Sequence, residues 1–365
     1  MKINKINKEF IFAFILFSIN LFTFLKLIFI SLTIPFLVKS IKKSYGFLFF
    51  FLGLFIYILI SFIKGYMDVV DLIPFIFIVL CYALGLLNFF DSFKISFYST
   101  IMLSSIAIIS VFKDIILNGF VGGIRSIPFY FSDELVSATV MAGYLCLGFS
   151  FISLLFFNTK NKSIILLFVL FSLICAIRLG SRTLILIALF GFISTSVIIF
   201  IGRSKKQNKY NFLIMSTLIV LSLFFYKKIS DILNYYFLDR IDNADASISG
   251  GGGRFEKWRL SLEKIYENPW GWEGEYYAHN FSLDIAKNVG ILPVLFFLVW
   301  QILILSYIPK LIYSNLDTKY KIYFIFNILF GFFLLNFEPI FDGFLYFLAL
   351  YCIIIGSISN LNYRK

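Results

Sequence analysis

Residues 45–63 read YGFLFFFLGLFIYILISFI and contain no charged side chain. A helix of this length crosses the hydrocarbon core of a bilayer, which takes about 17–25 predominantly apolar residues. Similar runs recur along the chain, which is 60% hydrophobic and 21% aromatic but only 14% charged. A soluble domain is about 45–50% apolar and about 25% charged, so a soluble core could not bury this excess. The composition therefore predicts an all-α polytopic integral membrane protein.

We expect about twelve transmembrane helices, because apolar runs of nearly the required length follow one another along the chain. The predicted spans are 10–25, 27–38, 45–63, 72–90, 95–117, 134–157, 164–179, 183–201, 211–229, 282–307, 322–338 and 343–358. The first two are short, and residues 10–38 could instead form one helix. Within a single membrane domain, residues 1–365, one long polar segment (230–281) separates the first nine spans (10–229) from the last three (282–358).

Lysine and arginine predict the orientation of the chain, because they collect in short cytoplasmic loops. Two spans in residues 10–38 place Lys39, Lys42 and Lys43 on the same side as the basic N-terminus, whereas one span would separate them. We therefore expect both termini in the cytoplasm. The predicted outer segments are 65–71, 118–133, 178–182 and about 230–280. The net charge of +12 is then explained by topology, so nucleic acid is not an expected partner.

The side chains that most often bind metals are scarce. The four cysteines lie inside apolar runs without a Cys-x-x-Cys pair, which predicts neither disulfides nor metal ligands; they are Cys81, Cys146, Cys175 and Cys352. The single histidine, His279, lacks the further histidine or cysteine ligands of a zinc site. We expect no metal and no cofactor.

The long outer segment carries the polar chemistry. Residues 254–267 follow a glycine run, 250–253, and predict an amphipathic helix, because their apolar residues recur every three or four positions. These apolar residues are Phe255, Trp258, Leu262 and Ile265. Asn268-Pro269 should end the helix, since the residue before proline avoids the helical region. The helix should lie at the membrane interface with its apolar face toward lipid or the helix bundle.

Four arginines are candidates for binding an anion. Arg178 and Arg182 share a face if one helix continues through both. Arginine near membrane depth usually faces a cavity or a partner, and its planar donors suit phosphate, although snorkelling to the interface is the alternative. Arg254 and Arg259 lie on different stripes of the amphipathic helix, where a solvated helix face is the alternative for Arg259. The preceding glycine run either cradles an anion or is a flexible linker.

His279 lies where the polar segment gives way to a span. An imidazole there can act as a base or as a hydrogen-bond donor toward a sugar hydroxyl. Asn280 either caps the following helix or binds substrate, and capping is the simpler interpretation. Carboxylates that could orient His279 or an arginine are Glu273, Glu275, Glu338 and Asp342.

Taken in order, these residues resemble the O-antigen ligase/polymerase superfamily, whose members are bacterial envelope proteins of the GT-C type. The residues that carry the resemblance are Ser181-Arg182-Thr183, Arg254, Trp258, Asn268-Pro269-Trp270-Gly271, His279-Asn280 and Gly290. In motif the resemblance covers about residues 175–295, and in architecture it covers the whole chain. Pro293 departs from it, because ligases tend to have a small residue or tyrosine there.

The resemblance implies that a glycan on undecaprenyl pyrophosphate is both donor and acceptor, at the outer face of the bacterial inner (plasma) membrane. It implies no nucleotide sugar, membrane lipid as surroundings, and a chain-length regulator protein as a further partner. The expected catalytic residues are His279, Arg254 and Arg178. The expected substrate-binding residues are Arg182, Arg259, Asn280, Trp258 and Glu338.

Three functions remain open, and polymerisation of lipid-linked repeat units into O-antigen or a related polysaccharide is favoured. The compact polar segment and Pro293 favour it over the alternative, a ligase that transfers finished glycan to lipid A–core or protein. A transporter of lipid-linked glycan is the remote alternative. Transporters usually have repeat-related halves and broken helices at the midplane, whereas the polar residues of this chain concentrate in one outer segment.

Overall fold

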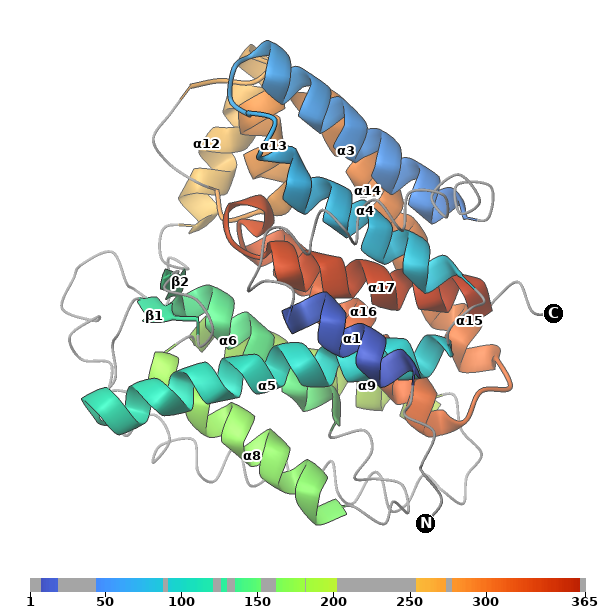
Figure 1. Cartoon of the computed structure of the whole chain (residues 1–365). Helices are drawn as coiled ribbons and strands as arrows, with labels where there is room; N and C mark the ends of the chain where they lie inside the picture. Colours follow the sequence, from blue (N-terminus) through green and yellow to red (C-terminus); the bar gives the residue numbers. More distant parts are fainter. Residues whose placement is uncertain are drawn as a thin grey trace. The chain divides into compact units, whose positions relative to one another are not determined.

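The computed structural model describes residues 8–18, 44–87, 91–120, 126–129, 135–151, 162–180, 182–201, 254–273 and 278–361. These residues are almost wholly helical (Figure 1). Five of their helices are long and apolar enough to cross a membrane: Tyr45–Ile63, Phe93–Asn118, Lys162–Leu179, Ile291–Tyr313 and Thr318–Phe337. The predicted all-α membrane class agrees with this. The number of twelve spans stays a prediction, because spans 27–38 and 211–229 lie outside the described residues.

The elements follow one another along the chain as short and long helices with one small hairpin. The helices are α1 (Lys8–Ser18), α3 (Tyr45–Ile63), α4 (Leu72–Leu86), α5 (Ser92–Asn118), α6 (Ala138–Leu147), η2 (Gly148–Phe151), α8 (Lys162–Leu179), α9 (Arg182–Ile201), α12 (Arg254–Glu267), α13 (Phe281–Val289), α14 (Ile291–Leu305), α15 (Tyr307–Tyr313), α16 (Thr318–Phe337), η4 (Ile340–Asp342) and α17 (Leu345–Leu361). Strands β1 (Ser126–Pro128) and β2 (Leu135–Ser137) pair antiparallel.

Two predicted spans have the wrong boundaries. Span 282–307 is not one helix: α13 and α14 are separated at Gly290, whose φ of 89° and ψ of −177° interrupt the helix. A Cβ at Gly290 would lie 2.6 Å from the Pro269 carbonyl oxygen, so the close approach of the preceding turn requires glycine here. Span 134–157 begins too early, because 135–137 form β2 and Ser137 caps α6 by accepting from Val140 N.

Contacts divide the chain into two compact units. Unit 1 comprises residues 1–106, 254–308 and 331–365, and unit 2 comprises residues 107–253 and 309–330. Helices α5, α15 and α16 contribute to both. The prediction of a single membrane domain remains untested.

In unit 1, α3 packs against α4 and α14, and α4 packs against α17 (Figure 1). The α4–α17 contact is close because glycine faces glycine: a Cβ at Gly85 would overlap the Ile353 carbonyl oxygen, and one at Gly356 would meet the Tyr82 carbonyl oxygen at 2.5 Å. Small residues at such crossings let membrane helices approach closely, where the hydrophobic effect gives no drive between helices.

Aromatic rings fill one end of unit 1. The Phe341 ring lies 4.7 Å from that of Tyr57, 5.2 Å from that of Phe75 and 5.0 Å from that of Phe281, measured between centroids. These contacts join η4 to α3, α4 and α13. Aromatic pairs of this kind hold η4 against α3, α4 and α13.

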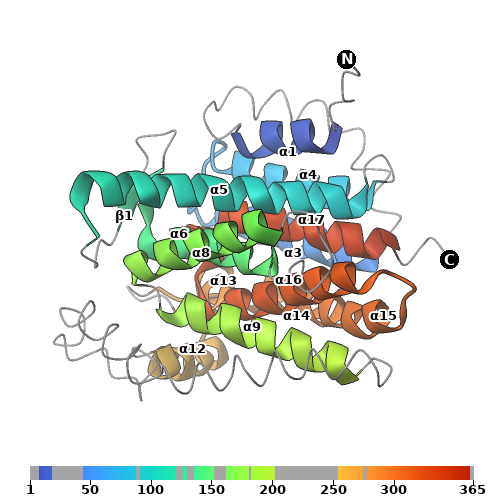
Figure 2. The same ribbon diagram turned by 90° about the horizontal axis from the view of Figure 1, so that it is seen from below.

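In unit 2, α6 packs against both α8 and α9 (Figure 2). Gly148 follows α6 and lies against α8, where a Cβ would come within 2.6 Å of Ser172 Oγ. The four cysteines, two in each unit, are free and buried as predicted: Cys81, Cys146, Cys175 and Cys352.

Gly85→Ala should destabilise unit 1, because the added Cβ meets backbone atoms of α17 that have no rotamer to change. We expect a loss of about 1–3 kcal/mol in the free energy of unfolding, measured by SDS titration in mixed micelles. Gly191→Ala is the matched control, since its Cβ would find its nearest neighbour at 3.6 Å. Equal stability of the two variants would show that the α4–α17 contact is looser than observed.

Candidate functional site

The turn that carries His279 has an unusual backbone. With a φ of 53°, His279 is the only non-glycine residue with positive φ in the described ranges. This conformation costs free energy and persists only where the surroundings impose it. Here Asp284 Oδ1 accepts from Ala278 N at 2.7 Å, and Asp284 Oδ2 accepts from Asn280 N at 3.0 Å. One buried carboxylate thus holds the backbone on both sides of the histidine.

Asn280 caps α13, as predicted. Its Oδ1 accepts from Ser282 N at 3.0 Å and from Leu283 N at 3.1 Å. Its Nδ2 donates to the Asn336 carbonyl oxygen at 2.9 Å, near the end of α16. Both ends of the amide are therefore occupied, and Asn280 fixes the start of α13 against α16.

Helix α12, predicted as 254–267, is confirmed with these bounds and ends before Pro269. Trp258 Nε1 donates to the Ala278 carbonyl oxygen at 2.7 Å, and its ring lies 5.5 Å from that of Phe337. Two of the predicted apolar residues point elsewhere: the side chains of Phe255 and Leu262 are exposed. One face of α12, which includes Trp258, therefore packs against the rest of unit 1. A second apolar face, which includes Phe255 and Leu262, is exposed.

Arg254 is held between backbone and carboxylate. Its Nη1 donates to the Phe337 carbonyl oxygen at 2.8 Å, and its Nη2 lies 3.1 Å from Glu338 Oε1. Glu338, one of the carboxylates considered as a partner for an arginine, is 1% exposed. Burial raises the pKa of Glu338 above its ordinary value, and the Arg254 guanidinium opposes that rise. We call Arg254, Trp258, His279, Asn280 and Glu338 the His279 cluster.

The electrostatics of the cluster keep His279 neutral. Burial, together with the positive charges of Arg254 and Lys257, lowers the pKa of His279 from 6.5 to about 4. Its Nδ1 is buried and has no hydrogen-bond partner among the described residues. A neutral imidazole carries one lone pair that can accept a proton or hydrogen bond.

The His279 cluster unites three separated stretches of the chain, and all five of its residues were expected to serve a site. Comparison with known protein families and with curated proteins finds no match. The family resemblance therefore rests on the motif residues alone. Among the described residues, no group of three or more histidines, cysteines and carboxylates is placed to hold a metal ion.

Arg178 lies in unit 2 and is 1% exposed. Its Nη2 is 3.1 Å from Asp114 Oδ2, and its Nε donates to the Gly119 carbonyl oxygen at 3.2 Å. Its Nη1 is buried without a partner in the described part of the chain. The ion pair joins the end of α5 to the end of α8, which gives Arg178 a structural role that sequence did not predict.

Two other predicted arginines are placed differently. Helix α8 ends at Leu179, Gly180 has a φ of 69°, and Arg182 begins α9, so Arg178 and Arg182 do not share one helix face. The side chain of Arg182 lies outside the described residues. The Arg259 side chain is 69% exposed and 4.0 Å from that of Glu263, the arrangement expected of a solvated helix face.

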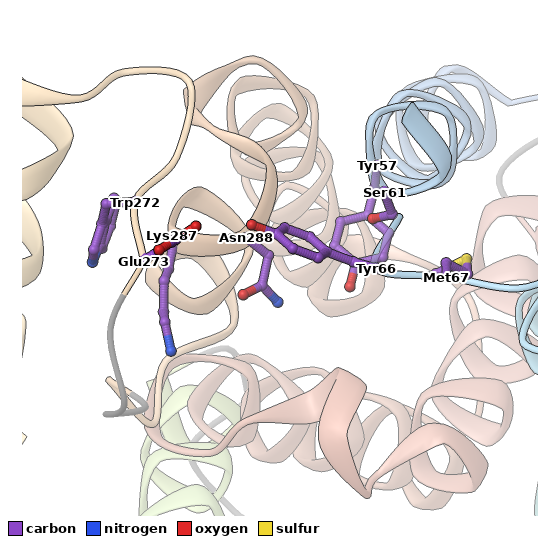
Figure 3. Close-up of a pocket in the computed structure, with 8 residues that line it drawn as sticks. All are labelled: Tyr57, Ser61, Tyr66, Met67, Trp272, Glu273, Lys287 and Asn288. Carbon is purple, nitrogen blue, oxygen red and sulfur yellow. The ribbon is translucent and has the colours of Figure 1, made fainter. Parts of the chain in front are cut away.

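Unit 1 also contains a cavity of about 360 Å³ that sequence did not predict. It lies by the C-terminal end of α13, where Lys287 and Asn288 line it (Figure 3). His279 precedes the N-terminal end of the same helix. Its lining residues are Tyr57, Ser61, Tyr66, Met67, Trp272, Glu273, Lys287 and Asn288. Of the carboxylates considered as partners of His279, Glu273 faces this cavity, and Glu275 lies outside the described residues.

Lys257→Gln should raise the pKa of His279 from about 4 toward 6.5, because one nearby positive charge is removed. The pKa should stay below 6.5, since burial is the larger cause. Because the chain has one histidine, a ¹⁵N-histidine NMR titration reports this group without ambiguity. Lys264→Gln on the exposed face of α12 is the control, and an unchanged pKa in Lys257→Gln would contradict the assigned cause.

Arg178→Met should lower the free energy of unfolding by about 3–5 kcal/mol, because Asp114 is left buried without its ion-pair partner. Replacing both partners, Arg178→Met with Asp114→Leu, should cost less than the single change. Unfolding by SDS in mixed micelles measures both. A wild-type stability of Arg178→Met would mean that the ion pair does not hold α5 to α8.

Proposed function

We propose that the protein is a glycosyltransferase that joins undecaprenyl-pyrophosphate-linked repeat units into O-antigen or a related surface polysaccharide. The observation that carries this proposal is the His279 cluster, in which a neutral imidazole lies within the electrostatic influence of Arg254. Transfer from a pyrophosphate donor needs these two functions, a proton acceptor for the attacking hydroxyl and a cation for the leaving group. The motif resemblance points to the same chemistry.

In the proposed reaction, a hydroxyl of the acceptor glycan attacks the anomeric carbon of the donor. The new glycosidic bond forms as the bond from that carbon to the pyrophosphate oxygen breaks. The hydroxyl proton passes to His279, and the lipid pyrophosphate leaves with the electron pair. Arg254 stabilises the negative charge on the pyrophosphate, for which its planar donors are suited.

The low pKa of free His279 fits this sequence of events. An isolated imidazole with a pKa of about 4 is a weak base at neutral pH. A pyrophosphate bound to Arg254 would offset the positive charges that depress this pKa, and so raise the basicity of His279. The histidine would then become a useful base only when the donor is bound, which limits side reactions.

Glu338 acts in this proposal as a positioning residue. It holds Arg254 in the absence of substrate, while its own burial raises its pKa and so favours the neutral carboxyl. A pyrophosphate can therefore compete for the guanidinium. Arg259, which is exposed on the same helix as Arg254, is proposed as a weaker contact.

The predicted topology gains support from contacts between segments expected outside. Lys64 Nζ, at the end of α3, donates to the carbonyl oxygens of Trp270 and Asn288. In unit 2, Arg178 donates to the Gly119 carbonyl oxygen. Lys64 directly precedes the predicted outer segment 65–71, and Trp270 lies in the segment of about 230–280. Gly119 and Arg178 lie in the segments 118–133 and 178–182, so each contact is consistent with the predicted topology. On the charge bias of the sequence we propose an outward-facing site, cytoplasmic termini and twelve spans.

Pro293 no longer helps to distinguish polymerase from ligase. It lies in the first turn of α14, where its missing N–H has no helical acceptor to lose. The helix start at Gly290 therefore accounts for this proline. Gene deletion in the native host separates the two functions: core carrying one repeat supports the polymerase, whereas bare core with polymer on the lipid carrier supports the ligase.

His279→Gln should lower the rate of glycosidic bond formation about 10²–10⁴-fold, since the proton acceptor is lost. Arg254→Gln should lower it about 10²–10³-fold. The assay uses purified protein in nanodiscs and lipid-linked repeat units, with products separated by gel. Glu256→Gln, an exposed change in α12, is the control. Full activity of both site variants would overturn the assignment, and absence of bond formation by the wild type would overturn the enzyme class.

A further inference from the structure

The cavity at the end of α13 is walled by two segments far apart in the sequence. Tyr57 and Ser61 come from the last turns of α3, and Tyr66 and Met67 from the loop that follows it. The opposite wall consists of the turn after α12 and the end of α13 (Figure 3). A volume of about 360 Å³ lies at the lower end of the range of small-molecule sites, about 300–1,000 Å³.

The walls of this cavity are held together before any ligand binds. Lys64 Nζ donates to the Trp270 carbonyl oxygen at 2.7 Å and to the Asn288 carbonyl oxygen at 3.1 Å. Trp272 N donates to the Lys287 carbonyl oxygen at 3.0 Å. Gly271, with a φ of 103°, lets the turn approach α13, where a Cβ would lie 2.7 Å from the Lys287 carbonyl oxygen. The site is therefore largely preformed, as binding sites usually are.

The lining combines aromatic rings with hydroxyl, amide and charged groups. Tyr57, Tyr66 and Trp272 offer apolar ring surface together with a polar end. Glu273 and Lys287 bring one charge of each sign, so the cavity favours neither an anion nor a cation. Lys64, the other amine nearby, already donates to two carbonyl oxygens. A neutral ligand with apolar faces and many hydroxyls, a saccharide, fits these properties.

Trp272 contributes its ring to the cavity. Its Nε1 is buried and has no hydrogen-bond partner among the described residues, so this nitrogen does not face the open space of the cavity. In Figure 3 the nitrogen lies on the side of the ring away from the other labelled residues. The neighbouring Trp270 is not part of the lining and is 70% exposed.

The cavity is separated from the His279 cluster by the length of α13. This helix has 9 residues and is therefore about 13 Å long. His279 precedes its first residue, and Lys287 and Asn288 lie near its last. A short oligosaccharide spans such a distance, so one glycan can occupy both places while its reacting end remains at His279.

We infer that this cavity is a saccharide-binding subsite that holds a sugar residue of the glycan remote from the bond being formed. The identity of that glycan as a reacting chain rests on the proposed function, whereas binding of the sugar does not. Tyr66 and Trp272 contact the sugar faces, and Ser61 and Asn288 bind its hydroxyls. Contacts remote from the reaction improve retention of the chain and thus favour longer products.

The test measures binding and reaction separately. The binding probe is the repeat-unit oligosaccharide released from the native host's lipid carrier by mild acid, labelled with a fluorophore at its reducing end. Fluorescence polarisation with protein in nanodiscs gives Kd. Trp272→Ala removes the ring and should weaken binding about 10- to 100-fold. Trp272→Phe keeps an aromatic ring at this position and should weaken binding less than Trp272→Ala. Trp270→Ala is the matched control and should bind like the wild type.

The reaction arm uses the same variants with lipid-linked repeat units. Trp272→Ala should raise KM and shorten the polymer while kcat at saturating substrate changes little, because His279 and Arg254 are untouched. A wild-type Kd in Trp272→Ala would overturn the subsite, whether or not bonds form. Loss of affinity in Trp272→Ala, with no bond formation by the wild type, would sustain the subsite and refute the enzyme.

Discussion

A single buried carboxylate organises the turn that carries His279 in unit 1. Asp284 accepts backbone N–H groups from both neighbours of His279, and this holds the histidine in the left-handed conformation. The same turn receives Trp258 from α12 through the Ala278 carbonyl oxygen, so α12 is joined to α13 by way of the turn. The backbone of the proposed base, and through it one of the contacts that dock the helix carrying Arg254, therefore depend on one side chain.

Burial governs the ionisation of the titratable groups in the His279 cluster. Glu338 and His279 lie where ionisation is costly, and Arg254 acts on both: its guanidinium helps to lower the pKa of the histidine and partly offsets the effect of burial on the carboxyl. Such a set responds strongly to an added anion, because fields are only weakly screened away from water. A polar cavity at the other end of α13 and this cluster together suit a long, hydroxyl-rich substrate with one charged end.

The helices that support the His279 cluster in unit 1 pack through close backbone contacts and aromatic rings. Gly85 and Gly356 bring α4 and α17 into backbone contact, and Phe341 joins the ends of α3, α4 and α13 through its ring contacts. Inside a membrane the hydrophobic effect does not distinguish protein from lipid, so close contact and aromatic packing must supply the specificity. This rigid base is what allows short turns to hold polar groups in defined positions.

Sequence alone determined the helical membrane class, the bounds of α12 and the cap at Asn280, because these depend on local composition, periodicity and residue type. It also selected the residues of the His279 cluster, through their order along the chain. Tertiary structure decided the break at Gly290, the pairing of Arg178 with Asp114 and of Arg254 with Glu338, and the cavity beside Trp272. Each of these depends on residues distant in sequence that approach within hydrogen-bond or van der Waals range. A local sequence pattern does not specify how close two residues far apart in the chain will lie, because that distance results from the packing of whole helices.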